Sequence, residues 1–416
     1  MLEFSDAPYQ FFEAKPSRPL IWLGRTLNRH FVVPGSNHLI KELIVEGDTE
    51  SPRKAIKNGD RILFVINHPS HSDPQVVTEV HRQLGIPSCF MAAYDVFLRS
   101  HFAAWFMQKL GHFSIDREGS DRKAMATAIK ILTKGEYALN IFPEGNVYLT
   151  NDRVTPFLDG TAFIALKAQK ALKDARVKII PISLKYTHLT LPRETVTQRL
   201  RKLGQDSGHS YSPGIDPLGA VIGLGTHLIS DFLKSHGFDR EIGSDEENLY
   251  EELSAFTLFL VTDLEKSLEL PTQDDAPLVA RIRKIRSTLH QIKTDGSTPS
   301  RDDVDQLADK AILAFRINGY LTPYLTENPT VDRLEETVER IAEDFYSKAM
   351  PRTGPRKAYA HLHPPLDVAE YLENADGKLR NAVSALTADM ESRVQEGITR
   401  LSEENTTPGG TLIEAL

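Results

Sequence analysis

The residues best suited to acid–base chemistry lie in the segment INHPSHSDP, residues 66–74. His68 closely follows the apolar run RILFVI (61–66), and Asp73 comes five positions later, just before Pro74. The run is typical of a buried strand, and Asp followed by Pro favours a helix start with Asp73 as the N-cap. A strand, a turn with the histidine and then a helix would place the imidazole at the carboxyl edge of a sheet, where α/β folds carry their sites.

A histidine in such a place can accept a proton from an alcohol, and a nearby carboxylate fixes its tautomer and stabilises the imidazolium. The spacing alone is weak evidence, because the chain has 14 His and 57 acidic residues and repeats the pattern at His290 and Asp295. That second pair ends a helical pattern with no strand before it, so we predict that His290 lies on the surface. A metal site of His68, His71 and Asp73 is disfavoured, since ligands so close in sequence rarely complete a tetrahedral site.

Three further segments are candidates for the same site. They are GHFSIDR (111–117), FPEG (142–145), which overlaps the end of the apolar run YALNIF (137–142), and VKIIPISL (177–184). Taken singly, the first two also fit an ordinary turn beside a strand. The interior proline of the last segment, Pro181, predicts an edge strand or a bulge.

Helical patterns alternate with these runs, at residues 74–85 and 121–135, which predicts an α/β sheet between about 61 and 186. After residue 186, long helical patterns follow with few strand candidates, and one more helix is expected along 379–401. We expect the acidic helices after residue 236 to present ordinary solvated faces, and the last residues to be frayed.

In this order, the four segments NHPSHSD, GHFSIDR, FPEG and IIPI resemble the four signature blocks of the glycerol-3-phosphate and 1-acylglycerol-3-phosphate (lysophosphatidate) acyltransferase family. The resemblance implies a mixed sheet flanked by helices. It implies that His68 is the catalytic base, that Asp73 orients it, and that Arg117 binds the acceptor. The third block would help to bind the acceptor, through Phe142, Pro143, Glu144 and Gly145.

The implied reaction moves a fatty acyl group from a thioester to the hydroxyl of glycerol phosphate or lysophosphatidate. It needs no cofactor, and acyl-CoA or an acyl-carrier protein would be the co-substrate. Backbone N–H groups at the helix start after Asp73 are expected to bind the oxyanion. Two alternatives stay open: a lysophospholipid-remodelling acyltransferase, and a non-catalytic lipid-binding protein with the same fold.

The sequence departs from the family pattern where cations would meet a phosphate. The residues after FPEG are Asn146, Val147 and Tyr148, where the family usually has threonine, arginine and serine. Tyr94 and Asp159 also stand where basic residues are common. We still favour a phosphate-bearing acceptor, with Arg153 and Lys167 as the nearest substitutes in sequence.

The segment KAYAHLHPPLDVAEYL (357–372) resembles the strand and turn that close the family's domain, but it comes more than a hundred residues late. A large, mostly helical insertion is therefore expected. The predicted division is an N-terminal helical or interfacial segment (1–50), an acyltransferase domain (51–186), the helical insertion (187–355), a strand and helix completing the domain (356–403), and a tail (404–416).

The charge is uneven: residues 1–186 hold 24 Lys and Arg against 19 Asp and Glu, and residues 187–416 hold 25 against 38. The first half suits an anionic membrane, and no basic run with aromatics suits nucleic acid. The stretch AKPSRPLIWLGRTLNRHFVV (14–33) fits either an interfacial helix or a packed one. We see no secretory signal or spanning segment, and the single Cys89 forms no internal disulfide, so we expect a cytoplasmic protein, peripheral on the inner membrane face.

Overall fold

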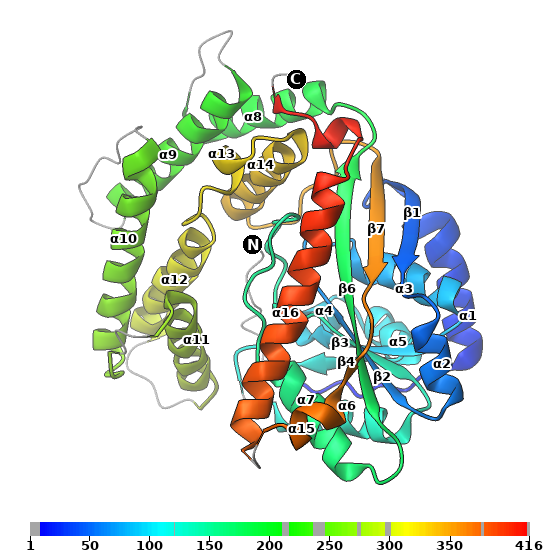
Figure 1. Cartoon of the computed structure of the whole chain (residues 1–416). Helices are drawn as coiled ribbons and strands as arrows, with labels where there is room; N and C mark the ends of the chain where they lie inside the picture. The colour runs from blue at the N-terminus through cyan, green and yellow to red at the C-terminus, as the bar shows by residue number, and fades with distance from the viewer. Residues whose placement is uncertain are drawn as a thin grey trace.

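The computed structural model describes residues 9–119, 121–209, 216–235, 246–272, 276–295, 301–375 and 378–413. Within these ranges the strands form one eight-stranded mixed sheet in the order β1-β7-β6-β2-β5-β3-β4, with β8 pairing with β6 (Figure 1). The predicted α/β class, a mixed sheet flanked by helices with a helical insertion, is confirmed. The strands are β1 (Ile40–Gly47), β2 (Arg61–Ile66), β3 (Ser88–Ala93), β4 (His112–Ile115), β5 (Ala138–Ile141), β6 (Val177–His188), β7 (Arg356–Leu362) and β8 (Leu366–Asp367).

Strand β2 explains why the sequence shows an unbroken apolar run. It is paired on both edges, with β5 and β6, and covered on both faces. Leu63 and Val65 pack into the core under α6 (Arg122–Lys134), α7 (Gly160–Ala171) and α16 (Leu379–Glu403). Ile62, Phe64 and Ile66 pack on the other face against α3 (Asp73–Leu84). Both faces of β2 are therefore apolar, as in parallel strands generally.

The expectation that Pro181 marks an edge or a bulge is wrong, because β6 lies inside the sheet between β2 and β7. On the antiparallel side, β8 pairs with Lys178 and Ile179, whereas β7 begins its pairing at Ile182. Pro181 lies in the gap between these partners, and its carbonyl accepts a hydrogen bond from His363 N (3.0 Å) on that side. Since a residue's N and C=O point to the same side of a strand, the proline nitrogen faces the gap and interrupts no ladder.

The strand predicted near residues 359–362 is β7, and it enters the sheet beside β6 in antiparallel and β1 in parallel orientation. The chain thus returns to the sheet after leaving it at the end of β6. Strand β1 was not predicted, since residues 40–47 were assigned to the N-terminal helical segment. Only Ile40 is fully buried, and charged residues leave no longer apolar run in this strand than the three residues 43–45, too short to have signalled a strand.

Helices surround the sheet, and the long helix α16 packs against β6 and runs down beside it in Figure 1. The predicted helices at 74–85 and 121–135 are α3 and α6, and both end at a glycine in the left-handed conformation, Gly85 and Gly135. The remaining elements of this part are α1 (Arg18–Leu27), the π-helix η1 (Asn28–Val32), α2 (Ser51–Lys57), α4 (Tyr94–Phe97), α5 (His101–Lys109) and α15 (Val368–Glu373).

Between β6 and β7 the described residues form helices only, apart from the isolated bridge of Thr330 to Leu412. Two cores hold them: one joins α10, α11 and α12, and the other joins α8, α9 and α14. Figure 1 shows these helices beside the sheet rather than within it. Their bounds are α8 (Arg193–Ser207), α9 (Pro217–Ser235), α10 (Glu246–Ser267), α11 (Leu278–Asp295), α12 (Arg301–Asn318), α13 (Tyr324–Glu327) and α14 (Val331–Tyr346).

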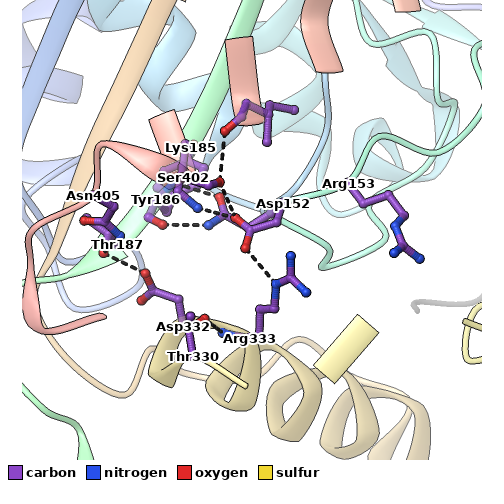
Figure 2. Close-up of polar contacts among 12 residues, drawn as sticks. Asp152, Arg153, Lys185, Tyr186, Thr187, Thr330, Asp332, Arg333, Ser402 and Asn405 are labelled. Atoms are coloured by element: carbon purple, nitrogen blue, oxygen red, sulfur yellow. Dashed lines mark hydrogen bonds and ion pairs between the residues drawn. The ribbon is translucent and has the colours of Figure 1, made fainter. Parts of the chain in front are cut away.

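A buried polar junction fastens α14 to the sheet (Figure 2). The Asp152 carboxylate accepts from Lys185 Nζ of β6, from Arg333 Nε of α14 (2.8 Å) and from Ser402 Oγ of α16 (3.0 Å). Asp332 accepts from Thr187 Oγ1 (2.6 Å) beside it. One carboxylate thereby links three elements that lie far apart in the sequence.

The tail is not frayed over the residues that the structure describes. The short 3-10 helix η2 (Pro408–Gly410) packs beside β6 and α14, and Gly409 lies so close to Asp332 that a Cβ there would come within 2.2 Å of a carboxylate oxygen. Ile413 is buried with the α14 core. The polar composition of this segment concealed the packing, because Ile413 is the one large apolar side chain that it buries among its described residues and the side chains of Asn405 and Thr407 bond to Thr187 Oγ1.

Candidate active site

His68 and Asp73 form the pair that their spacing predicts. The turn after β2 carries His68, whose Nδ1 donates to Asp73 Oδ2 at 2.7 Å. The Asp73 side chain is 0% exposed, and that of His68 is 16% exposed. A carboxylate only accepts, so Nδ1 carries the proton and the lone pair of the neutral ring lies on Nε2. The partly exposed imidazole is therefore in the tautomer that a general base requires.

Asp73 is held by more than the histidine. Its Oδ2 also accepts from Ser70 N (3.0 Å), and its Oδ1 accepts from Tyr186 Oη (2.6 Å). The residue begins α3, but the N-cap is Ser72 rather than Asp73, which corrects the sequence prediction by one position. The carboxylate is occupied by the histidine, the turn and the tyrosine, so it does not cap the helix.

Tyr186 is the main residue of this site that the sequence analysis missed. It is buried, and the guanidinium of Arg356 lies 5.0 Å from the centre of its ring. Arg356 Nη2 also donates to Ser72 Oγ at 2.9 Å, so it contacts the turn and the tyrosine together. A signal was present: Tyr186 continues the alternation of Ile182 and Leu184 on one face of β6, where an apolar residue would be expected.

The third block supports the histidine from two directions. The Phe142 ring stacks on the His68 ring with 4.3 Å between centroids and an interplanar angle of 18°. Glu144 Oε1 accepts from His68 N (2.7 Å), and its Oε2 accepts from Thr155 N (3.0 Å). Burial raises the pKa of Glu144 to about 8, while these hydrogen bonds act against the rise. The Glu144 side chain thus fixes the backbone of the turn.

Arg117, for which the resemblance implies a role in acceptor binding, lies beside the end of the third block. Its Nη1 donates to Gly145 O at 3.3 Å and to Asn146 Oδ1 at 3.4 Å, and its Nη2 lies 3.4 Å from Asp95 Oδ1. Burial lowers the pKa of Arg117. Gly145 has φ +75°, a conformation that favours glycine, and Leu158 N donates to Pro143 O (2.9 Å) to close the loop. The structure therefore brings every predicted site residue to one edge of the sheet.

His71 and His290 have partners that the sequence did not show. His71 Nε2 lies 3.0 Å from Glu343 Oε2 of α14, so it contacts the insertion. Within the described ranges no group of three or more His, Cys, Asp or Glu side chains is arranged to hold a metal ion. The prediction that His290 lies on the surface is wrong, because its Nε2 lies 3.1 Å from Asp116 in the second block and the side chain is 19% exposed. The side chain of Asp295 lies outside the described residues.

The two cations proposed as substitutes lie elsewhere. Arg153 forms an exposed ion pair with Glu327 (2.7 Å), and it points away from the Asp152 cluster in Figure 2. Lys167 lies over the ring of Phe163 on α7, 5.4 Å from its centre. Closeness in sequence to the third block was misleading, because the loop after it runs toward α14 and α16.

Several amides around the start of α3 donate within the turn itself. The amides of Ser70, Ser72 and Asp73 donate to Asp73 Oδ2, Ser70 Oγ and Ser70 O respectively, and Pro74 has no N–H. The start of α3 therefore keeps these amides for its own turn. Of the amides after Asp73, which were the ones expected to bind the oxyanion, Val76 N donates to Ser72 O at 3.0 Å. For Gln75 N the expectation stays a prediction.

The fold and this site define an α/β domain with a histidine–aspartate pair at a strand end and a partly buried arginine beside the third block. Residues 42–185 match the family model described as Acyltransferase. The matched segment contains all the predicted site residues and runs from β1 into β6, so it leaves out the helices from α8 onward and β7. No curated protein matches the chain. The match supports acyl transfer as the general activity of this domain.

Proposed function

We propose that this protein transfers a fatty acyl group from an acyl thioester to the hydroxyl of a glycerol phosphate or a lysophosphatidate. The observation that carries the proposal is the His68–Asp73 pair, with a buried aspartate held on both oxygens and a partly exposed imidazole. In the reaction, His68 Nε2 takes the proton of the acceptor hydroxyl as its oxygen attacks the thioester carbonyl. Asp73 stabilises the imidazolium, which then protonates the departing thiolate.

No nucleophilic residue is needed for this reaction, because the acceptor oxygen attacks the thioester directly. Cys89 does not fit an acyl-enzyme role, since it is buried and burial raises the pKa of its thiol to about 12. The acyl donor is a thioester of coenzyme A or of an acyl-carrier protein.

The test is a product analysis with labelled acyl-CoA and labelled acyl-carrier protein against a panel of acceptors. Glycerol 3-phosphate, lysophosphatidate, lysophosphatidylcholine and monoacylglycerol should be offered at equal concentration. The proposal expects labelled lysophosphatidate or phosphatidate as the main product. A main product from lysophosphatidylcholine would make the protein a remodelling enzyme instead, and no labelled lipid with any acceptor would favour a non-catalytic role.

We further propose that the protein works at an anionic membrane surface through α1, η1 and α5. Trp22, Phe31 and Phe102 are 69%, 70% and 72% exposed. The helices adjoin, since Ser17 N at the start of α1 donates to Lys109 O at the end of α5 (2.9 Å). Exposed bulky apolar side chains beside arginines are typical of an interfacial contact. No helix among the described residues is long and apolar enough to cross a membrane.

This contact is tested by flotation with vesicles of phosphatidylcholine containing phosphatidylglycerol. A variant with Trp22→Ser and Phe102→Ser should lose most binding while keeping its melting temperature. A matched variant with Leu258→Ser and Phe259→Ser removes exposed apolar side chains from α10, on the acidic insertion, and should bind as the wild type does. Equal binding by all three proteins would contradict the assignment.

A further inference from the structure

The helical insertion brings arginines to the end of the third block, beside Arg117 of the first domain. Arg283 of α11 donates from Nη2 to Glu144 O at 3.3 Å, and Arg117 donates to the next carbonyl, Gly145 O, at 3.3 Å. Two guanidinium groups from distant parts of the chain thus bind consecutive carbonyls of the third block. The same block contacts His68 through Glu144 Oε1, so these arginines adjoin the catalytic turn.

A third arginine, Arg286, lies one turn along α11 on the same side. It forms an ion pair (2.9 Å) with Glu118, the residue that follows Arg117. Its guanidinium lies 4.6 Å from the centre of the Phe315 ring. Burial, together with the nearby charges of Arg117 and Arg283, lowers the pKa of Arg286 to about 10, although Glu118 acts against this. Arg286 therefore lies near two like charges, which an anion bound among them would offset.

The guanidinium of Arg340, on α14, is the feature that points to a ligand. The residue is 4% exposed, and its Nε and Nη2 have no hydrogen-bond partner among the described residues. The guanidinium lies 4.2 Å from the centre of the Tyr320 ring, and it interacts electrostatically with the Tyr148 hydroxyl, as Arg283 does. A buried cation with unpaired donors is costly, and an anion that accepts from them removes the cost.

Tyr148 explains how the first domain and the insertion meet here. It occupies the position where the family that the sequence resembles usually has serine. The residue before it, Val147, stands where that family usually has arginine. Its buried ring belongs to the core of α10–α12, with 6.2 Å to the Phe315 ring. In this chain the loop after the third block packs against the insertion through Tyr148 instead of carrying an arginine. The insertion contributes Arg283 and its neighbours to the same place.

We propose that Arg283, Arg286 and Arg340 form, with Arg117, a composite binding site for the phosphate monoester of the acceptor. The site is built across the two parts of the chain. A phosphate monoester carries close to two negative charges and three acceptor oxygens, which suits several guanidinium groups. This inference rests on the proposed function and names the residues that select its substrate class.

The test compares phosphate-bearing and neutral acceptors with the same acyl chain. The ratio of kcat/KM for lysophosphatidate to that for monoacylglycerol should fall 10- to 100-fold in Arg283→Gln and in Arg340→Gln. Arg340→Lys, which keeps the charge, should lose less. Arg153→Gln is the charge-matched control outside the site, and its ratio should equal that of the wild type. Glycerol 3-phosphate as a second acceptor shows whether a soluble phosphate is recognised in the same way.

Binding provides a second measurement that needs no catalysis. Lysophosphatidate should bind to His68→Ala in calorimetry, and Arg340→Gln added to it should weaken the affinity at least tenfold with an unchanged circular dichroism spectrum. Equal losses on charged and neutral acceptors, or unchanged affinity in Arg340→Gln, would overturn the composite site and leave the acyltransferase proposal standing. Full activity in His68→Ala would overturn that proposal instead, without changing the binding result.

Discussion

Replacing Tyr186 with phenylalanine removes one hydroxyl and leaves the shape of the β6 face unchanged. The hydroxyl donates to Asp73 Oδ1 (2.6 Å). In the variant, Asp73 Oδ2 would still accept hydrogen bonds from His68 Nδ1 and Ser70 N. A hydrogen bond to a charged group contributes about 1.5–3 kcal/mol, so the free energy of unfolding should fall by about that amount. The carboxylate would then pivot about Oδ2, and the imidazole would lose its fixed orientation.

The expected kinetic effect follows from that orientation. Loss of about 1.4 kcal/mol of transition-state stabilisation lowers kcat about tenfold, and KM for the acceptor should stay within about twofold because Tyr186 is not expected to touch it. The assay is steady-state acyl transfer at saturating thioester. Tyr371→Phe is a matched control, since Tyr371 Oη donates to Asp389 Oδ2 (2.5 Å) between α15 and α16, away from the site. A kcat within twofold of wild type in Tyr186→Phe would refute the positioning role.

The remaining predictions concern stability. Asp152→Ala leaves Lys185, whose side chain is 2% exposed, without its carboxylate partner. The free energy of unfolding in urea should therefore fall by about 3–5 kcal/mol. A fall below about 1 kcal/mol would show that the junction does not fasten α14 to the sheet. Burial lowers the pKa of His81 to about 3, so its neutral form stabilises the fold above pH 6.5 and this contribution is lost as pH falls toward 3, by about 1.4 kcal/mol per pH unit. His81→Leu should therefore flatten the fall in unfolding free energy between pH 6.5 and 5, and an unchanged slope would contradict a buried neutral histidine.

Local patterns were enough to predict the strands and helices that carry the site. The run at 61–66 is β2 to the residue, and the spacing of His68 and Asp73 holds because both lie in one short turn between adjacent elements. Strand β7 was predicted from a resemblance, and β1 was missed because its exposed face carries charged residues. Propensity and periodicity describe neighbours in sequence, which is why they succeed here.

The rest of the site depends on contacts that no local pattern encodes. Tyr186 meets Asp73 across 113 positions, and Arg283 meets Glu144 across 139. Arg153 looked suitable because it follows the third block closely, yet the loop carries it to Glu327. His290 looked like a surface residue because nothing in its own helix shows that α11 packs on Asp116. Sequence spacing predicted the proposed base, but only the fold showed that Arg283 of the insertion reaches the third block beside it.

The central claim is that His68 is the general base of an acyl transfer. The most direct test is the rate of acyl transfer from labelled thioester to lysophosphatidate by His68→Ala, beside wild type and His227→Ala. His227 is a fitting control, because it also pairs with an aspartate (Asp231, 3.3 Å) but lies on α9 in the insertion. The account predicts that His68→Ala loses about 3 kcal/mol of transition-state stabilisation, a hundredfold or more in kcat/KM, with an unchanged melting temperature, while His227→Ala keeps the wild-type rate. A wild-type rate in a folded His68→Ala protein would contradict it.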